Sequence, residues 1–158
     1  MDTLTIRKLL KTFKCFKGVY PCDLLPYNSD LPLNIIVNTD PSYMSGEHWV
    51  CICIDKSGKG EYFDSFGLPP FKEEIFKFLE TKCYRWSFNR IPLQNIASVT
   101  CGNYCVLYII YRCQSLNKNL FYSNFNENTL NNDKRIQQIF KDFSLAKRMR
   151  RSDNLKYQ

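Results

Sequence analysis

The sequence predicts an α+β protein with a small central mixed sheet flanked by helices. Helical patterns lie at both ends of the chain, and short apolar runs typical of strands lie between them. Helices before, between and after several strands favour packing of helices on the faces of one sheet. With 158 residues the chain has the length of about one domain. We expect a single domain over residues 1–150 and a disordered basic tail over 151–158.

The first half of the chain predicts one helix followed by three strands. Residues 3–16 carry apolar side chains at roughly helical spacing, and Gly18, Pro21 and Pro26 indicate a loop after this helix. Residues 33–38 are typical of a strand. Residues 48–55 and 60–64 indicate a hairpin, because the Lys-Ser-Gly-Lys segment between them has good turn chemistry.

The second half predicts two helices, one strand and a basic terminal helix. Pro69 and Pro70 precede a helix over 71–82, and residues 86–93 alternate as a strand does. A helix over 101–114 carries Val106, Leu107 and Ile109 toward the core. A loop over 115–132, rich in Asn and Ser, leads to a basic helix over 133–150.

The composition excludes a disordered chain, and the hydropathy predicts no membrane partner. An apolar fraction of 44% with 12 Phe and 10 Tyr fits a globular core. The longest apolar run, 105–111, is far shorter than the roughly 18–20 residues that a membrane helix needs.

Basic residues interrupt any signal-peptide core within the first 20 residues. We therefore expect an intracellular protein that is not secreted.

Eight cysteines in such a protein predict mostly reduced thiols. We expect most of them to be small apolar side chains in the core. The Cys51-x-Cys53 and Cys101-x3-Cys105 spacings lack the paired two-residue gaps of a zinc ribbon, so we expect no metal site.

The net charge of +7 is concentrated at the two ends of the chain. Residues 1–17 carry five basic side chains against Asp2, and residues 134–151 carry seven against Asp142. Such asymmetry favours a polyanionic partner, nucleic acid first, because neutralised phosphates release counterions. A solvated surface that keeps the protein soluble explains the same charges, and both interpretations stay open.

One imidazole, one carboxylate, one amide and one thiol follow each other along the chain as His48, Asp64, Gln94 and Cys101. His48 is the only histidine, so it must be the base if the chain is a thiol hydrolase. Asp64 ends the strand that pairs with the strand starting at His48, so the two side chains can be neighbours. Cys101 begins a helix, where N–H groups and the helix dipole favour a thiolate. Gly102 allows the close approach of a substrate backbone.

Each of these residues alone also has a purely structural interpretation. A histidine at a strand start is commonly half-buried, an Asp before Ser-Phe-Gly caps turns, and a Cys-Gly pair commonly opens a packed helix. Their joint order, at the ends of elements and without a competing histidine, favours catalysis.

These residues lie in segments that resemble the adenovirus protease (adenain) family of cysteine endopeptidases of DNA viruses and virus-like DNA transposons. More distantly, the segments are similar to the SUMO-specific proteases. The resemblance implies an adenain-like cysteine protease fold and covers about residues 17 to 112. It is carried by Lys17-Gly-Val-Tyr-Pro-Cys-Asp23, Ile36-Val-Asn-Thr39, Gly46-Glu-His-Trp49, Tyr62-Phe-Asp-Ser-Phe-Gly67 and the stretch 94–105.

The resemblance implies a role for each of these site residues. Cys101 would be the nucleophile and His48 its general base, which later protonates the leaving amine. Asp64 would orient His48 and stabilise its imidazolium. Gln94 would donate to the oxyanion beside the backbone N–H of Cys101, and Trp49 would shelter either the imidazolium or the oxyanion region.

The resemblance also implies a substrate class, partners and a location. Family members cleave after glycine in short extended motifs, so we expect Gly-containing motifs of polyprotein or capsid precursors as substrates. The chemistry would need no cofactor. Adenoviral proteases are activated by DNA and by a short peptide in a disulfide with a surface cysteine. Cys83 falls at the matching place, and the basic termini would bind DNA in a host nucleus or virion.

Two departures from the family limit the resemblance. Asp64 stands where adenoviral enzymes commonly carry Glu, whereas SUMO-specific proteases carry Asp there. The chain after residue 112 shows no resemblance, so its basic helix has no assigned role. Two alternative functions therefore stay open: a deconjugating protease acting on ubiquitin-like proteins, and a catalytically idle nucleic-acid-binding scaffold.

Overall fold

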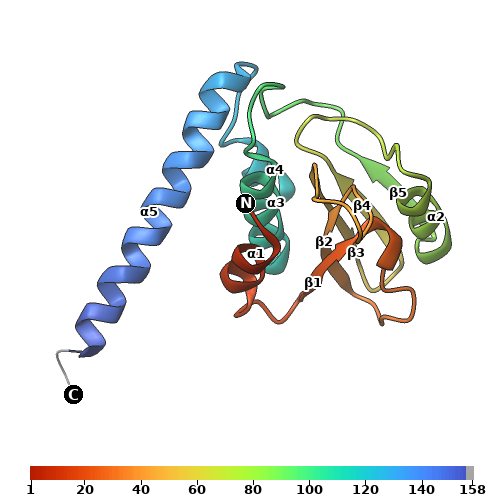
Figure 1. Ribbon diagram of the computed structural model, residues 1–158, viewed down its shortest axis with the longest axis horizontal. Helices are drawn as coiled ribbons and strands as arrows, with labels where there is room; N and C mark the ends of the chain where they lie inside the picture. Colours follow the sequence, from red (N-terminus) through yellow and green to blue (C-terminus); the bar gives the residue numbers. More distant parts are fainter. Residues whose placement is uncertain (156–158) are drawn as a thin grey trace.

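A five-stranded mixed sheet forms the centre of the protein, with helices packed on its faces (Figure 1). The computed structural model describes the backbone of residues 1–155 and the side chains of residues 1–142. The outer strand pairs are parallel and the inner pairs antiparallel. The strand order follows the chain: β1 (Phe16–Pro21), β2 (Leu33–Asn38), β3 (Trp49–Ile54), β4 (Lys59–Phe63) and β5 (Arg85–Phe88). The predicted α+β class is confirmed.

Alternate side chains of β3 pack into two cores on opposite faces of the sheet, as the period of a strand requires. Cys51 and Cys53 face α3 (Cys101–Cys113), which packs with α1 (Thr3–Leu10) and α4 (Lys118–Tyr122). Val50 and Ile52 face α2 (Glu73–Lys82). All six residues of β3 are buried, so the central strand gives a fixed base to the residue that precedes it, His48.

The last helix, α5 (Thr129–Leu155), has its first turns beside α3, and its remainder runs away from the sheet (Figure 1). Ile136 is fully buried in the core around α3, which anchors these first turns. The expected tail over 151–158 starts inside this helix. Residues 156–158 lie outside the described residues, so the disorder of the tail stays a prediction.

The prediction of one helix over residues 3–16 was wrong in its second half. The helix begins at Thr3, where the Asp2 side chain accepts a hydrogen bond from the Thr5 N–H (2.8 Å), and it ends at Leu10. Residues 16–21 instead pair in parallel with β2 and form an edge strand. The apolar residues Phe13 and Phe16 continue the helical spacing, but both pack against the α3 core from outside the helix.

A short helix, α4, was also missed in the predicted loop over 115–132. Its N-cap is Asn117, whose side chain accepts from the Asn119 N–H. Its one buried side chain, Phe121, packs edge-on against Phe63 and Tyr108. Aromatic packing against distant residues thus stabilises this helix, although the polar composition of the segment predicted a loop.

One disulfide was not predicted. It joins Cys15, just before β1, to Cys113 at the end of α3, with the two Cα atoms 5.6 Å apart. The other six cysteines are free thiols. The bond ties the edge strand to the helix that begins at Cys101.

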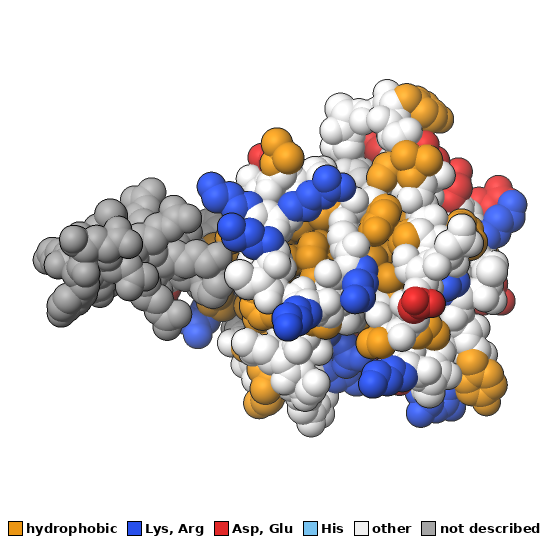
Figure 2. All heavy atoms as spheres, turned by 90° about the horizontal axis from the view of Figure 1, so that it is seen from below, with side chains coloured by type: hydrophobic (Ala, Val, Ile, Leu, Met, Phe, Trp, Pro, Cys, Tyr) orange, Lys and Arg blue, Asp and Glu red, His pale blue; other side chains and the backbone are white. Residues whose placement is uncertain are grey.

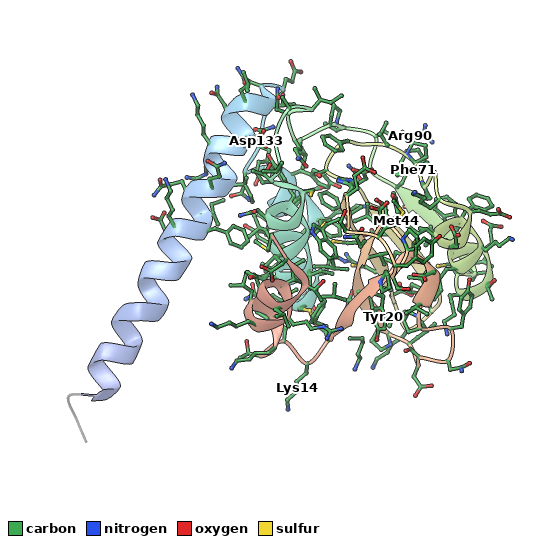
Figure 3. All side chains as sticks on the ribbon, in the orientation of Figure 1. Lys14, Tyr20, Met44, Phe71, Arg90 and Asp133 are labelled. Atoms are coloured by element: carbon green, nitrogen blue, oxygen red, sulfur yellow. A yellow bond between two sulfur atoms is a disulfide. The ribbon has the colours of Figure 1, made fainter. Side chains whose placement is uncertain are left out.

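Basic side chains are exposed along the N-terminal segment. Lys14 points away from the body of the protein, and in the view from below Lys and Arg side chains outnumber acidic ones (Figures 2 and 3). Arg7, Lys8, Lys11 and Lys17 are exposed as well. Within the part of the chain that the structure describes, no helix is long and apolar enough to cross a membrane.

Candidate active site

His48 and Asp64 meet where the β3–β4 hairpin opens. The register pairs Cys51 with Phe63, so Asp64 leaves β4 at the end of the hairpin where His48 precedes β3. The His48 Nε2 atom lies 2.9 Å from Asp64 Oδ1, and both residues are buried. This contact leaves the other ring nitrogen, Nδ1, for a second partner.

Cys101, the first residue of α3, borders the same cavity as His48. Burial raises the pKa of the Cys101 thiol, but hydrogen bonds with His48 and with the Trp49 and Gly102 N–H groups outweigh burial and lower it. Burial lowers the pKa of His48, whereas hydrogen bonds with Asp64 and Cys101 raise it to about 9. These opposite shifts favour a thiolate–imidazolium pair at neutral pH.

Every other free cysteine has the opposite environment. Burial is the largest cause in all five and raises the pKa of each thiol, and the cations that lower it at Cys22 (Lys72), Cys53 (Arg112) and Cys83 (Lys82) do not offset the loss of solvation. These are Cys22, Cys51, Cys53, Cys83 and Cys105. Cys101 is therefore set apart as the one free thiol with thiolate character.

The turn after β4 holds both the carboxylate and the imidazole in place. Asp64 Oδ1 also accepts from the Phe66 N–H (2.8 Å), and the Phe66 ring stacks on the His48 ring with centroids 4.9 Å apart. Gly67 closes the turn with a φ of 71°. A Cβ atom there would lie 2.8 Å from the backbone nitrogen of Pro92, so glycine is required both by φ and by space.

Asn89 fixes the backbone of Asp64 from the neighbouring segment after β5. Its Oδ1 accepts from the Asp64 N–H (2.9 Å), and its Nδ2 donates to the Asp64 carbonyl (2.6 Å). Sequence reasoning missed this residue. The two residues are 25 positions apart, and only the parallel pairing of β4 with β5 brings them together.

Gln94 lies on the loop before α3 and borders the same cavity as Cys101. It is 3% exposed, its Nε2 donates to the Ser98 carbonyl (2.9 Å), and its Oε1 accepts from the Ser65 hydroxyl (2.6 Å). The four residues singled out from the sequence, His48, Asp64, Gln94 and Cys101, thus border one cavity of about 600 Å³.

Trp49 forms a wall of this cavity together with Met1, and Gly102 lies against both residues. The Trp49 indole donates to the Met1 carbonyl (2.9 Å), and a Cβ atom on Gly102 would lie 2.9 Å from the Met1 Cβ. A second cavity of about 620 Å³ shares Met1, Gly46 and Trp49 with the first. The two cavities therefore adjoin at these three residues. Phe71 borders the first and Met44 the second (Figure 3).

Asp133, in the first turns of α5, is a second residue that sequence reasoning missed. Its buried carboxylate accepts from the Thr100 hydroxyl (2.8 Å), the Tyr104 hydroxyl (3.0 Å) and the Asn95 N–H (3.1 Å). In Figure 3 it faces the helix that carries Cys101. Both flanks of the Gln94-to-Cys101 loop are thereby attached to α5.

Cys83, the expected attachment point of an activating peptide, is the C-cap of α2 and is partly buried. Burial raises the pKa of its thiol to about 11, and a Cβ atom on Gly60 would overlap its sulfur. A thiol in this state is a slow partner in disulfide exchange at neutral pH. The role of Cys83 in activation stays a prediction.

Comparison with solved structures identifies the fold. The ASFV pS273R protease superposes with a TM-score of 0.57 at 18% identity, over 85% of this chain and 63% of that protein. This chain shares the fold of that protease. A second structure of the same ASFV protease, in its selenomethionine form, matches at 27% identity and a TM-score of 0.42, over 66% of this chain and 40% of that one. No protein-family model and no curated protein matches.

The protease fold holds its loop before α3 through Asp133, so replacing this residue should destabilise the protein. Asp133→Ala leaves the Thr100, Tyr104 and Asn95 donors without their acceptor, and we expect a loss of about 2–4 kcal/mol in the free energy of unfolding. Urea unfolding measures this loss. The control is Asp142→Ala on the same helix, an exposed site where a change within about 0.5 kcal/mol is expected. Equal losses in the free energy of unfolding of the two variants would contradict this role of Asp133.

Proposed function

We propose that this protein is a cysteine endopeptidase in which Cys101, His48 and Asp64 form the catalytic triad. The observation that carries the proposal is that His48, Asp64, Gln94 and Cys101 border one cavity, with His48 Nε2 2.9 Å from Asp64 Oδ1. The lowered pKa of the Cys101 thiol, paired with the raised pKa of His48, supports it, and the pKa of every other free thiol is raised. Such pairing activates a thiol as a nucleophile. The shared fold with the ASFV protease supports the same conclusion.

In the proposed reaction the Cys101 thiolate attacks the carbonyl carbon of the scissile peptide bond. Negative charge moves to the carbonyl oxygen, where the Gln94 amide and the Cys101 backbone N–H donate to it. The His48 imidazolium gives its proton to the leaving amine, and the C–N bond breaks to leave a thioester. Neutral His48 then takes a proton from water, whose oxygen attacks the thioester; the C–S bond breaks, the carboxylic acid leaves, and the Cys101 thiolate and the His48 imidazolium are restored.

The proposed substrates are extended Gly-containing segments of viral or transposon structural precursors. Two adjoining cavities, the first of which borders Cys101, give room for an extended chain. The chain's own side chains supply every proton transfer in this scheme, so we propose no cofactor for the chemistry.

Exposed apolar side chains near Cys101 favour a second candidate, a deconjugating protease acting on ubiquitin-like proteins. Leu68, Phe71, Ile96 and Val99 border the catalytic cavity and are 50–89% exposed. A row of exposed apolar side chains suits the docking of a folded domain. The same row would equally hold apolar residues of an extended precursor, so the substrate decides between the two functions.

The basic ends of the chain support a proposed nucleic-acid partner, either as an activator or, in the idle-scaffold alternative, as the main ligand. Exposed basic side chains gather on α1 and the segment after it, and Lys134 and Arg135 are exposed at the start of α5. Binding through phosphates weakens with salt as counterion release declines. A response that stays flat between low and physiological salt would contradict this partner.

Thiol alkylation and substrate cleavage together test the proposed function. With iodoacetamide at pH 6–7, Cys101 should react before the other free thiols, and peptide mapping by mass spectrometry identifies the labelled residue. The labelled protein is then assayed on Gly-containing peptides and on tagged ubiquitin-like precursors, with and without DNA. Peptide cleavage that labelling abolishes supports the endopeptidase. Cleavage of the ubiquitin-like precursors alone supports deconjugation, and slow, unselective labelling without cleavage contradicts both.

The pH dependence of cleavage should have two limbs. Activity needs Cys101 ionised and His48 protonated, so kcat/KM should rise on the acid side through the lowered thiol pKa and fall on the basic side near pH 9. Asp64→Asn removes the carboxylate that supports the imidazolium, so the basic limb should move to lower pH. A kcat/KM profile over pH 4–10 measures both limbs. An unchanged basic limb in Asp64→Asn would contradict the role of Asp64.

A further inference from the structure

We propose that Ser65 is a positioning residue that orients the Gln94 amide, so that two consecutive residues fix both halves of the catalytic machinery. Asp64 holds the base His48, and Ser65 holds the oxyanion donor Gln94. This inference rests on the proposed function, and it gives a role to Ser65, a residue for which the family resemblance implies none.

Three hydrogen bonds join Ser65 to the segment of Gln94. The Ser65 hydroxyl donates to Gln94 Oε1 at 2.6 Å, and the Ser65 carbonyl accepts from the N–H groups of Leu93 (2.8 Å) and Gln94 (3.0 Å). Ser65 is fully buried and Gln94 is 3% exposed. Water therefore competes poorly for this contact, and a lost partner is costly.

The chemistry of the amide explains why its orientation matters. Only the nitrogen end of a glutamine side chain can donate, so an oxyanion needs Nε2 and is repelled by Oε1. A hydroxyl bound to Oε1 and a carbonyl bound to Nε2 fix which end is which. Nε2 carries two hydrogens and the Ser98 carbonyl takes one, which leaves the other for the oxyanion.

The turn at residues 64–67 couples this donor to the base. Asp64 bonds His48, Ser65 bonds Gln94, and the Phe66 ring stacks on His48. A donor that is fixed before the reaction needs no reorganisation in the transition state, and this is the origin of the catalytic effect of an oxyanion hole. Ser65 thus acts through Gln94 and does not touch the reacting atoms.

Steady-state kinetics of wild type, Ser65→Ala, Gln94→Ala and the double variant test the inference. We expect Ser65→Ala to lower kcat by roughly 10- to 100-fold with KM nearly unchanged, because only the transition state bears the oxyanion. The double variant should lose no more than Gln94→Ala alone, since Ser65 acts only through that side chain. The control Ile52→Val, in the core beside α2, removes a methyl group without touching the site.

Two outcomes would overturn the inference. The first is a kcat of Ser65→Ala within about threefold of that of the wild type, because the loss of an oxyanion donor costs far more than this. The second is a kcat of the double variant that falls by the product of the two single-variant losses. A readout independent of cleavage is hydrogen exchange of the Gln94 side-chain amide, followed by NMR. Exchange should be slow in the wild type and Ile52→Val and much faster in Ser65→Ala. If the wild type cleaves nothing, the proposed function fails, whereas equal exchange in all three proteins removes the role of Ser65.

Discussion

Cys101→Ala is expected to reduce peptide cleavage to a small residual rate. The thiolate is the only proposed nucleophile, and the remaining groups can still polarise a carbonyl but cannot form the thioester. Removing a catalytic nucleophile typically costs on the order of 10⁶-fold in kcat in a comparable serine enzyme. Release of product from a Gly-containing peptide, followed by mass spectrometry to detect low turnover, measures the effect.

The matched control for this variant is Cys22→Ala. Cys22 is a buried free thiol in the core beside α2, and burial raises the pKa of its sulfur. Its loss should leave kcat close to that of the wild type. Substantial cleavage by Cys101→Ala, or an equal loss in both variants, would show that the nucleophile lies elsewhere.

Gln94→Ala should lower kcat by about 100- to 1000-fold, the usual cost of one oxyanion donor. The substrate still binds, so KM should change far less than kcat. Initial rates over a range of substrate concentrations separate the two parameters. Gln114→Ala at the exposed end of α3 removes the same side chain without touching the cavity. If Gln94→Ala matched this control, the backbone N–H of Cys101 alone would have to hold the oxyanion.

The elements that the sequence predicted best are those with strong local patterns. Residues 33–38 form a strand with the predicted bounds, and the helix predicted over 101–114 begins at Cys101. In β1, Gly18 and Pro21 read as loop residues because the sequence does not reveal the partner strand. Its pairing with β2 joins residues that are far apart in the sequence, such as Gly18 and Ile35. Such non-local pairing outweighs local propensity.

The same limit applies to the site. His48, Asp64, Gln94 and Cys101 could be selected because each belongs to a residue type that the chemistry requires. Their supports could not, because Ser65, Asn89 and Asp133 are common polar residues whose partners lie 25–38 positions away. A hydrogen bond between such residues follows from the tertiary fold and leaves no local signal.

The packing of α3 on β3 has a consequence for how the protein loses activity on heating. The Cys105 thiol donates to the Trp49 carbonyl (3.2 Å), and the Cys51 thiol donates to the Cys105 carbonyl (3.5 Å). The helix that starts at Cys101 and the strand that follows His48 are thus hydrogen-bonded to each other through buried residues. Segments of this kind open only when the whole domain opens. Thermal inactivation and global unfolding should therefore share one midpoint, with no range of temperatures in which a folded protein has lost its proposed catalytic pair.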